Sequence, residues 1–373
     1  MKDLSLNGRR FSGQQLLTFS PGNYSGLSDY EKRLLHFCYQ WLNGQETFTL
    51  RTSGSTGSPK PITLSREQMA LSARLTGQTL GLAMGDHALV CLSADYIAGR
   101  MMLVRGFELG LRLTIIDPAS NPLLGFDEDA SFDFTALVPL QLQEILTNTP
   151  QKAPILNRMK AILIGGAPVS VALQARLQMV TAPIYHTYGM TETVTHIALR
   201  RLNGPQAGDY FVPFEDVKLG LDDRGCLTIT AALTRGATLH TNDLVDLQPD
   251  GHFRWLGRID NVINSGGVKV QVEKVERVLE EFLYHYGGGL YADRRFFVGP
   301  LDHPRFGQAV VAIIEGAPLE NNGADLRTAL RETLPQFLSR YEVPQKTYFV
   351  RTFAETPTGK IDRPAALRKL AGQ

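Results

Sequence analysis

The chain has 373 residues, and its 38 lysines and arginines nearly balance its 37 aspartates and glutamates, so the formal net charge is +1. This balance argues against nucleic acid or an acidic membrane surface as a partner, because a marked basic excess normally holds such partners. Hydrophobic residues make up 43% of the chain and charged residues 20%, which is typical of a folded protein with a large core.

Signals that would direct the chain to a membrane or out of the cell are not evident in the sequence. No apolar run reaches the roughly 18 residues that a membrane-spanning helix needs, and the first residues lack the apolar stretch of a secretory signal. Cys38, Cys91 and Cys226 lie far apart without a Cys-x-x-Cys pair, which favours reduced, buried thiols over a cysteine nucleophile. We therefore expect a cytoplasmic protein without a membrane span.

The first third of the chain alternates between helical and extended patterns. Apolar residues at helical spacing predict a helix over 28–43, with Ser28 as its N-cap. Alternating residues predict two strands, around 48–50 and 62–64, that flank a turn rich in glycine, serine and threonine. A further helix is expected over 66–82.

Short apolar runs separated by helix-like stretches then predict a largely parallel sheet. These runs cover residues 88–93, 112–117, 134–139 and 161–166. After residue 205 the pattern changes to short strand-like pieces, and beyond residue 257 helices and strands form a unit of their own. The expected fold class is therefore α/β. It comprises a large N-terminal α/β domain with a mixed β subdomain (1–257) and a small mobile C-terminal α+β domain (258–373).

The turn between the first two strands has the composition of a phosphate-binding loop. Its glycines let backbone amides approach an anion, its hydroxyls donate hydrogen bonds, and its lysine adds positive charge. The residues concerned are Thr52, Ser53, Gly54, Ser55, Thr56, Gly57 and Lys60. It differs from the common P-loop, because two residues separate the glycines and Pro61 follows the lysine. The structural alternative is a flexible Gly/Ser hairpin.

Three further motifs follow in order: Tyr188-Gly189-Met190-Thr191-Glu192-Thr193, Gly257-Arg258-Ile259-Asp260 and Pro357-Thr358-Gly359-Lys360-Ile361-Asp362-Arg363. Together with residues 52–60, this ordered set resembles the adenylate-forming superfamily, which includes acyl-CoA synthetases, luciferases and peptide-synthetase adenylation domains. The resemblance covers most of the chain from residue 50 to 365. It implies ATP, Mg2+ and coenzyme A as cofactors and co-substrate, a small carboxylic acid as substrate, and a monomer or homodimer.

Catalysis in such an enzyme must be largely electrostatic, because a carboxylate attacks the α-phosphorus of ATP and two anions approach each other. The resemblance makes Lys360 the mobile cation that bridges these groups. It also makes Glu192 the Mg2+ residue and Thr191 a hydroxyl donor to the phosphate. The structural alternatives are an exposed surface lysine for Lys360 and, for Glu192, a charge at a helix N-terminus.

The resemblance assigns the rest of the nucleotide site to small residues and to one carboxylate. Asp243 would accept hydrogen bonds from both ribose hydroxyls, and Arg258 would make a second ribose or phosphate contact. Asn242 stands where the family usually has glycine, and asparagine tolerates a positive φ better than most residues. The residues expected around the adenine and phosphates are Gly165, Gly166, Ala167, Tyr188 and Gly189.

A hinge and a thiol tunnel complete the implied mechanism. Asp260 falls at the family's hinge position, about which the small domain turns between the two half-reactions. Gly266 and Gly267 would then let the backbone pass close to the pantetheine chain of coenzyme A. A purely structural Gly-Gly turn is the alternative.

The shortened N-terminal region resembles the o-succinylbenzoate–CoA ligases of menaquinone biosynthesis. A dicarboxylate needs a cation for its second carboxylate, and Arg105 falls at the arginine position of these ligases, counted from Gly99. Arg100 would lie about 140° away around the helix, so only one of the two faces the acyl pocket. Tyr96 replaces the family's histidine. The alternative for Arg105 is a surface position.

His186 and Thr187 are expected to border the same pocket. We therefore expect an ATP- and magnesium-dependent acid–CoA ligase, with o-succinylbenzoate as the favoured acid. Two alternatives stay open. The first is a ligase for another aryl or acyl acid, or one that transfers the acyl group to a carrier-protein thiol. The second is a non-catalytic nucleotide-binding protein.

Overall fold

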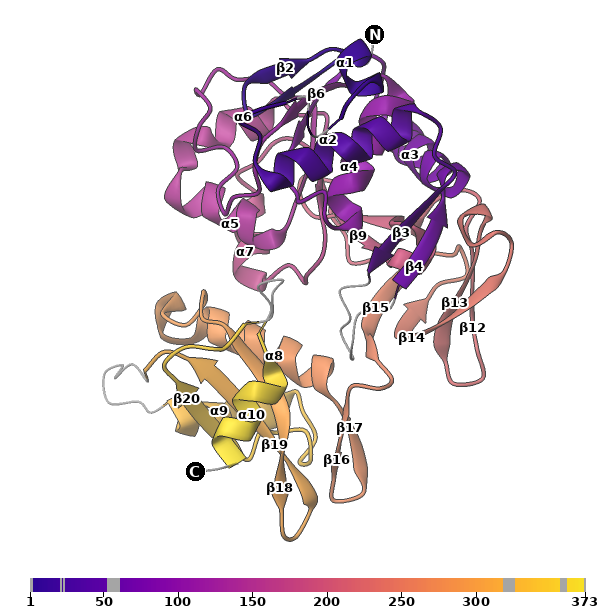
Figure 1. The fold of residues 1–373 in the computed structure, drawn as a ribbon. Helices are drawn as coiled ribbons and strands as arrows, with labels where there is room; N and C mark the ends of the chain where they lie inside the picture. Colours follow the sequence, from indigo (N-terminus) through magenta and orange to yellow (C-terminus); the bar gives the residue numbers. More distant parts are fainter. Residues whose placement is uncertain are drawn as a thin grey trace.

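The computed structural model describes residues 3–20, 22, 24–51, 61–317, 326–355 and 361–371. Within these ranges, a nine-stranded sheet forms the centre of the large domain (Figure 1). Its strands, in spatial order, are β11 (Val212–Pro213), β10 (His196–Arg201), β9 (Ile184–Gly189), β8 (Ala161–Ile164), β7 (Phe134–Leu137), β5 (His87–Val90), β6 (Arg112–Ile115), β1 (Leu4–Leu6) and β2 (Arg9–Phe11). The strands from β1 to β9 in this order pair in parallel, and antiparallel strands occupy both edges. The predicted largely parallel sheet is confirmed.

Helices cover both faces of this sheet, and alternate strand residues point to opposite faces. On β5, Ala88 and Val90 pack into one buried cluster and Leu89 into another. The helices of the first layer are α2 (Asp29–Leu42), α3 (Arg66–Leu80) and α4 (Ile97–Leu109), with α1 (Gly13–Leu17) beside them. Those of the second are α5 (Pro139–Asn148), α6 (Ala153–Asn157) and α7 (Val171–Leu177).

The helix predicted from residue 28 begins as its capping signal indicates. The Ser28 hydroxyl accepts a hydrogen bond from the Glu31 amide at 3.1 Å, and the Glu31 carboxylate accepts one from the Ser28 amide at 2.7 Å. This reciprocal capping box satisfies two amides that the helix itself leaves unpaired. Trp41 and Phe37 from the same helix are buried in the first cluster.

Two smaller sheets complete the large domain. An antiparallel sheet contains β12 (Lys218–Leu221), β13 (Cys226–Thr230), β14 (Thr238–Leu247) and β15 (Phe253–Arg258), which corresponds to the expected β subdomain. The pair β3 (Thr47–Arg51) and β4 (Pro61–Ser65) flanks residues 52–60. Phe48, Leu50 and Leu64 are buried, so the predicted alternation in these two strands is confirmed.

The small domain has a sheet and cores of its own. Its strands are β16 (Val262–Ser265), β17 (Val268–Gln271), β18 (Phe296–His303), β19 (Gly307–Glu315) and β20 (Lys346–Val350). Helices α8 (Val272–His285) and α9 (Leu326–Thr333) pack on one face, and α10 (Arg363–Ala371) packs on the other. None of the buried clusters found among the described residues joins residues of this domain to residues of the large domain.

Cys38, Cys91 and Cys226 are all free and buried, as expected, and burial raises the pKa of each thiol. A raised pKa keeps a thiol protonated and unreactive.

None of the helices in the described ranges combines the length and apolar character that crossing a bilayer requires.

The two domains touch where α8 lies beside α7 (Figure 1), and α5 contacts the segment that follows α8. Arg176 of α7 forms a 2.7 Å ion pair with Asp293, and the side-chain amide of Gln143 donates to the same carboxylate at 3.3 Å. The backbone amide of Val171 donates to the Glu280 carboxylate at 3.2 Å. Burial raises the pKa of Glu280 to about 7, and the nearby Glu281 and Glu276 carboxylates act in the same direction.

The contact through Glu280 should therefore strengthen as the pH falls. Burial in the contact raises the pKa of Glu280 from an ordinary 4.5 to about 7, although the Val171 amide acts in the opposite direction, and separation of the domains would remove the burial. Glu280 therefore binds a proton more tightly when the domains are in contact, so protonation stabilises the contact. This stabilisation is lost as the pH rises through 7. Energy transfer between dyes on Met84→Cys and Phe337→Cys, both exposed positions, should show more contact at pH 6 than at pH 8.5. In Glu280→Gln the contact should not respond to pH, and an unchanged response in that variant would contradict the assignment.

Candidate active site

The carboxyl ends of β8 and β9 bring two predicted motifs to one edge of the sheet. The two strands are parallel neighbours, with Ile162 opposite Ile184 and Ile164 opposite His186. Gly165, Gly166 and Ala167 follow β8 directly, while β9 ends at Gly189 and leads into a short 3-10 helix, Thr191–Thr193. Ligands of open parallel sheets bind at this edge, so the motifs lie where a nucleotide site is expected.

Packing explains why glycine occupies these turns. A Cβ atom at Gly165 would lie 2.4 Å from the Thr187 hydroxyl, and one at Gly189 would lie 2.1 Å from the carbonyl oxygen of Thr195. Gly166 has a φ of +83°, which a residue with a side chain rarely adopts. The turns are therefore fixed by their own chain, and they expose backbone to an incoming ligand.

A buried carboxylate, Asp243, joins three of the predicted nucleotide residues. Asp243 on β14 lies opposite Arg258 on β15. The Tyr188 hydroxyl donates to its Oδ2 at 2.5 Å, and Arg258 Nη1 lies 3.8 Å from its Oδ1. Burial, followed by the Asp243 charge, raises the pKa of Tyr188 far above its usual range, so the phenol stays a donor. A hydrogen bond from Tyr188 and an ion pair with Arg258 thus join three separate sequence motifs at one carboxylate.

Arg258 also binds the carboxylate of the predicted hinge residue. Its Nε donates to Asp260 Oδ1 at 2.9 Å and its Nη2 to Asp260 Oδ2 at 2.7 Å. These bonds are the main reason that the pKa of Asp260 lies below its ordinary value. Arg258 is therefore shared between the site carboxylate and the junction of the two domains, a link that the sequence motifs did not indicate.

The residue expected to take the second carboxylate, Arg105, lies in the core. Only 3% of its surface is exposed, so the alternative of a surface arginine is wrong. Its Nη2 donates to the Thr195 hydroxyl at 3.4 Å, and its Nε has no partner among the described residues. Burial lowers the pKa of Arg105 to about 10, which still leaves the guanidinium charged at neutral pH.

A group of polar side chains surrounds this cation and was not identified from the sequence. Ser72 bonds to Thr195 at 2.8 Å, and Thr76 bonds to the His196 ring at 3.2 Å. Burial, and then the charge of Arg105, lowers the pKa of His196 well below its usual range, so this histidine is neutral. The available signal was that Ser72 and Thr76 stand four residues apart on the predicted helix 66–82, and so share one face.

The remaining predicted pocket residues have separate surroundings. Arg100 donates to the Ala94 carbonyl at 2.9 Å, away from Arg105, as the helical spacing predicts. Tyr96 is exposed at the start of α4. Burial and then Arg200 lower the pKa of His186 to about 4, so its ring is neutral. His186 and Thr187 are adjacent on β9 and point to opposite faces, so they cannot line one face together.

Several predicted residues fall outside the described ranges. These are Lys360 and the loop residues Thr52, Ser53, Gly54, Ser55, Thr56, Gly57 and Lys60. Their flanks are in place: Arg51 pairs with Pro61 across the hairpin, and Glu355 bridges to Ile361.

Two further expectations concern Mg2+ and the position of Asn242. The Glu192 carboxylate is exposed at the sheet edge, and no group of three or more potential metal ligands occurs in the described part of the chain. One carboxylate together with substrate phosphates is a donor set that suits Mg2+.

Asn242 lies inside β14 without a positive φ, so the left-handed backbone considered for it is wrong.

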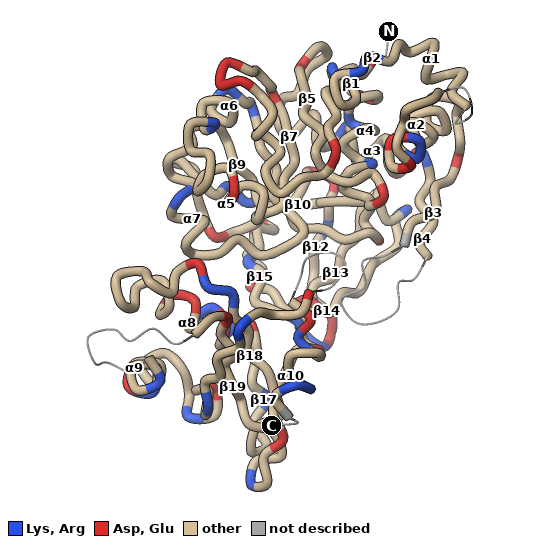
Figure 2. Tube along the Cα trace, turned by 60° about the vertical axis from the view of Figure 1, so that its left-hand side comes forward, with Lys and Arg blue, Asp and Glu red and all other residues tan. Residues whose placement is uncertain are grey.

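The two glycines expected at the thiol tunnel lie far from this site. Gly266 and Gly267 form the tip of the β16–β17 hairpin, both with positive φ. The hairpin extends from the small domain away from the large domain (Figure 1), and β17 is also remote from the central sheet in the view of Figure 2. This orientation of the domains does not bring the hairpin to Asp243.

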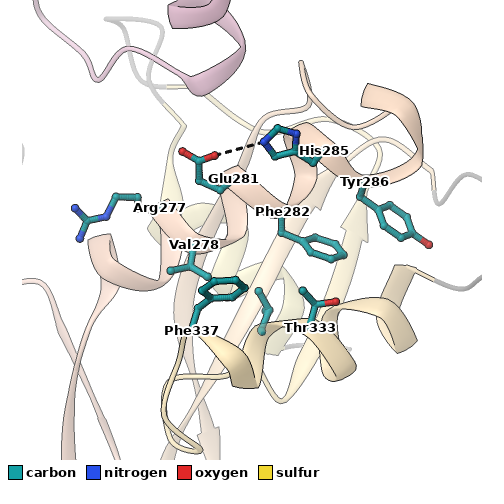
Figure 3. Close-up of a pocket in the computed structure, with 9 residues that line it drawn as sticks. Arg277, Val278, Glu281, Phe282, His285, Tyr286, Thr333 and Phe337 are labelled. Carbon is teal, nitrogen blue, oxygen red and sulfur yellow. Dashed lines mark ion pairs between the residues drawn. The ribbon is translucent and has the colours of Figure 1, made fainter. Parts of the chain in front are cut away.

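A cavity of about 670 Å³ lies on the small domain, between α8 and the segment that follows α9 (Figure 3). Its wall is mostly apolar, with Phe282 and Phe337 facing the space and Glu281 paired with His285 at the rim. None of the predicted site residues lines it. The cavity is therefore separate from the candidate active site.

Comparison with known proteins gives consistent results. The AMP-binding enzyme family matches residues 47–241. A probable 2-succinylbenzoate–CoA ligase of Mycobacterium tuberculosis is 29% identical over 362 residues, which cover 89% of this chain and 86% of that protein.

Among solved structures, an acyl-CoA synthetase (AMP-forming)/AMP-acid ligase II-like protein from Dyadobacter fermentans is 43% identical. Its TM-score is 0.60, and the match covers 94% of this chain and 97% of that one. The o-succinylbenzoate–coenzyme A synthetase of Bacillus subtilis, in complex with ATP and a magnesium ion, has a TM-score of 0.67 at 19% identity, over 86% of this chain and 69% of that one. At this low identity the second match shows a shared fold.

The hydrogen bond from Tyr188 to Asp243 should contribute measurably to stability. Tyr188→Phe removes the donor and leaves a buried carboxylate oxygen without it, which should lower the free energy of unfolding by about 2 kcal/mol. Urea denaturation followed by tryptophan fluorescence measures this change. Tyr210→Phe is the matched control, because Tyr210 donates to Asp246, which lies on β14 like Asp243 but at a more exposed place. This variant should lower the free energy of unfolding by less. Equal effects of the two variants would contradict the assignment.

Proposed function

The chain belongs to the AMP-binding enzyme family, and we propose that this AMP-forming acid–CoA ligase acts on an aryl dicarboxylic acid, with o-succinylbenzoate as the favoured substrate. The observation that carries the choice of a dicarboxylate is the buried charge of Arg105. Among the described residues it has hydroxyl and thioether neighbours and no carboxylate partner.

A buried guanidinium without a counter-ion is costly, because burial removes hydration that hydroxyl groups replace only in part. A substrate carboxylate would supply the missing charge through two parallel hydrogen bonds. Thr195, Ser72 and the neutral His196 would then surround the carboxylate as uncharged neighbours. The name of the relative from M. tuberculosis, a probable 2-succinylbenzoate–CoA ligase, supports the same substrate.

For the nucleotide, we propose the following roles. Asp243, held by Tyr188 and Arg258, accepts hydrogen bonds from the ribose hydroxyls. Residues 165–167 and Gly189 lie along the adenine and phosphates, and residues 52–60 hold the triphosphate. Glu192 would hold Mg2+, which neutralises phosphate charge when bound, and Thr191 would donate to a phosphate oxygen. The B. subtilis structure with ATP and magnesium supports this assignment by its shared fold.

The proposed reaction has two half-reactions. In the first, a carboxylate oxygen of the acid bonds to the α-phosphorus of ATP and pyrophosphate leaves. Lys360 reduces the repulsion between the two anions at that step. In the second, the coenzyme A thiol loses its proton, its sulfur bonds to the acyl carbon, and AMP leaves.

For the second half-reaction, we propose that the small domain (258–373) turns relative to the large domain (1–257) about Asp260. The turn brings Gly266 and Gly267 to the acyl-adenylate. The separate cores of the two domains support this boundary.

We also propose a cytoplasmic location, which the free, buried cysteines support.

ATP–pyrophosphate exchange tests the substrate. The wild-type enzyme should exchange with o-succinylbenzoate, and Arg105→Met should raise the KM for this acid by about 100-fold, the effect of losing two charge-assisted hydrogen bonds. The KM for benzoate, which lacks the second carboxylate, should change little. Arg100→Met on the same helix is the control.

Three outcomes would contradict the proposal. The first is strong exchange with a monocarboxylic acid and none with o-succinylbenzoate. The second is an equal rise in the KM for o-succinylbenzoate and for benzoate in Arg105→Met. The third is an absence of exchange with any acid, which would exclude an adenylate-forming activity.

A further inference from the structure

We propose that Asn242 is a positioning residue that ties the hinge carboxylate of Asp260 to the ribose side of the nucleotide site. This proposal rests on the proposed function, because it concerns the turn of the small domain about Asp260. Asn242 directly precedes Asp243 on β14, so the tether begins next to the carboxylate assigned to the ribose.

Asn242 contacts the domain junction through both its side chain and its backbone. Its Nδ2 donates to Asp260 Oδ2 at 3.0 Å, and its carbonyl oxygen accepts a hydrogen bond from the Ile259 amide at 2.8 Å. A residue without a side-chain amide could keep the backbone contact and would lose the contact to the carboxylate. The side chain of Asn242 is therefore the part that acts on Asp260.

The orientation of this amide is set from its other end. Asn242 Oδ1 accepts a hydrogen bond from Arg224 Nη1 at 3.0 Å. Arg224 is itself fixed, because it donates to the Thr241 carbonyl at 2.7 Å and to Asp222 Oδ2 at 3.0 and 2.8 Å. An arginine on one side and a carboxylate on the other leave one amide orientation that satisfies both neighbours. The amide therefore always presents its N–H group to Asp260.

The junction is also held on the side of the small domain. Gln271 Nε2 donates to the Arg258 carbonyl at 2.8 Å, and Asn261 Nδ2 donates to Glu273 Oε1 at 2.8 Å, at the start of α8. Asn242 on β14 and Arg258, the last residue of β15, belong to the antiparallel sheet that precedes the proposed hinge, so a turn about Asp260 is expected to loosen their contacts with its carboxylate. The long side chain of Arg258 can follow that carboxylate, whereas the short amide of Asn242, fixed by Arg224, cannot.

The tether consequently stabilises the domain orientation seen here. In this orientation the β16–β17 hairpin points away from the large domain, which contains Asp243, so it is not the orientation proposed for thioester formation. The proposed mechanism has two orientations, and we assign the one seen here to acyl-adenylate formation, so losing the tether should disfavour that half-reaction. It should leave thioester formation from preformed acyl-adenylate unchanged or faster.

A double-mutant cycle between Asn242→Ala and Asp260→Ala tests the tether without relying on activity. The readout is energy transfer between dyes on Met84→Cys and Phe337→Cys in the full chain. Asn242→Ala alone should shift the equilibrium between the two orientations by about tenfold, the effect of one hydrogen bond to a charged group. In the Asp260→Ala background the same change should shift it less than about twofold, because the partner is already gone. Asn148→Ala, at the exposed end of α5, should shift nothing.

The two half-reactions provide the second measurement. Pyrophosphate exchange with o-succinylbenzoate should slow in Asn242→Ala, while the reaction of preformed o-succinylbenzoyl-adenylate with coenzyme A should not. The same shift in both backgrounds of the cycle, or no shift in either, would overturn the role of Asn242. A wild-type enzyme inactive with every acid would instead overturn the proposed function, and the energy-transfer cycle would still decide the role of Asn242.

Discussion

The pairing of β14 with β15 sets Asp243 opposite Arg258, and this single register connects the candidate nucleotide site to the domain junction. Tyr188 reaches the same carboxylate from the edge of the central sheet. Arg258 lies at the end of β15 and reaches forward to Asp260, two residues later. A slip of one residue in this pairing would turn Asp243 away from both partners. The proposed ribose contact and the proposed hinge therefore depend on one stretch of antiparallel sheet.

The two buried charges at the candidate site differ in whether the protein itself supplies an opposite charge. Asp243 receives a phenol hydroxyl and a guanidinium from the protein itself, so its charge is balanced before any ligand arrives. Arg105 receives hydroxyl and thioether contacts, and no described carboxylate balances it. These partners hold the Asp243 carboxylate in a fixed position, which suits a neutral ligand such as a sugar. An unbalanced cation favours an anionic ligand.

The sequence predicted those parts of the molecule that depend on local rules. The strands around Phe48 and Leu64 follow alternation, and Ser28 begins its helix through a capping box with Glu31, three positions later. The glycine-containing motifs at the ends of β8 and β9 were predicted as nucleotide contacts from the resemblance, whereas their common position at one edge of the sheet follows from the observed parallel pairing. Burial of Arg105 was not predictable in this way, since it depends on how α4 packs against α3 and the loop that contains Thr195.

The links around the junction could not be predicted because they join residues from three separate segments. Asp222, Asn242 and Asp260 come together only when β13, β14 and β15 adopt their observed registers. The sequence did mark Asn242 as unusual, but for the wrong reason, a left-handed backbone. Its amide proved to be the important feature, with an arginine on one side and a carboxylate on the other.

The most direct test of this account is a crystal structure of the enzyme with ATP and o-succinylbenzoate, or with the acyl-adenylate formed from them. We expect both ribose hydroxyls within hydrogen-bonding distance of Asp243 and the second carboxylate of the acid paired with Arg105. A nucleotide bound away from Asp243, or a second carboxylate that leaves Arg105 without a counter-ion, would contradict the account.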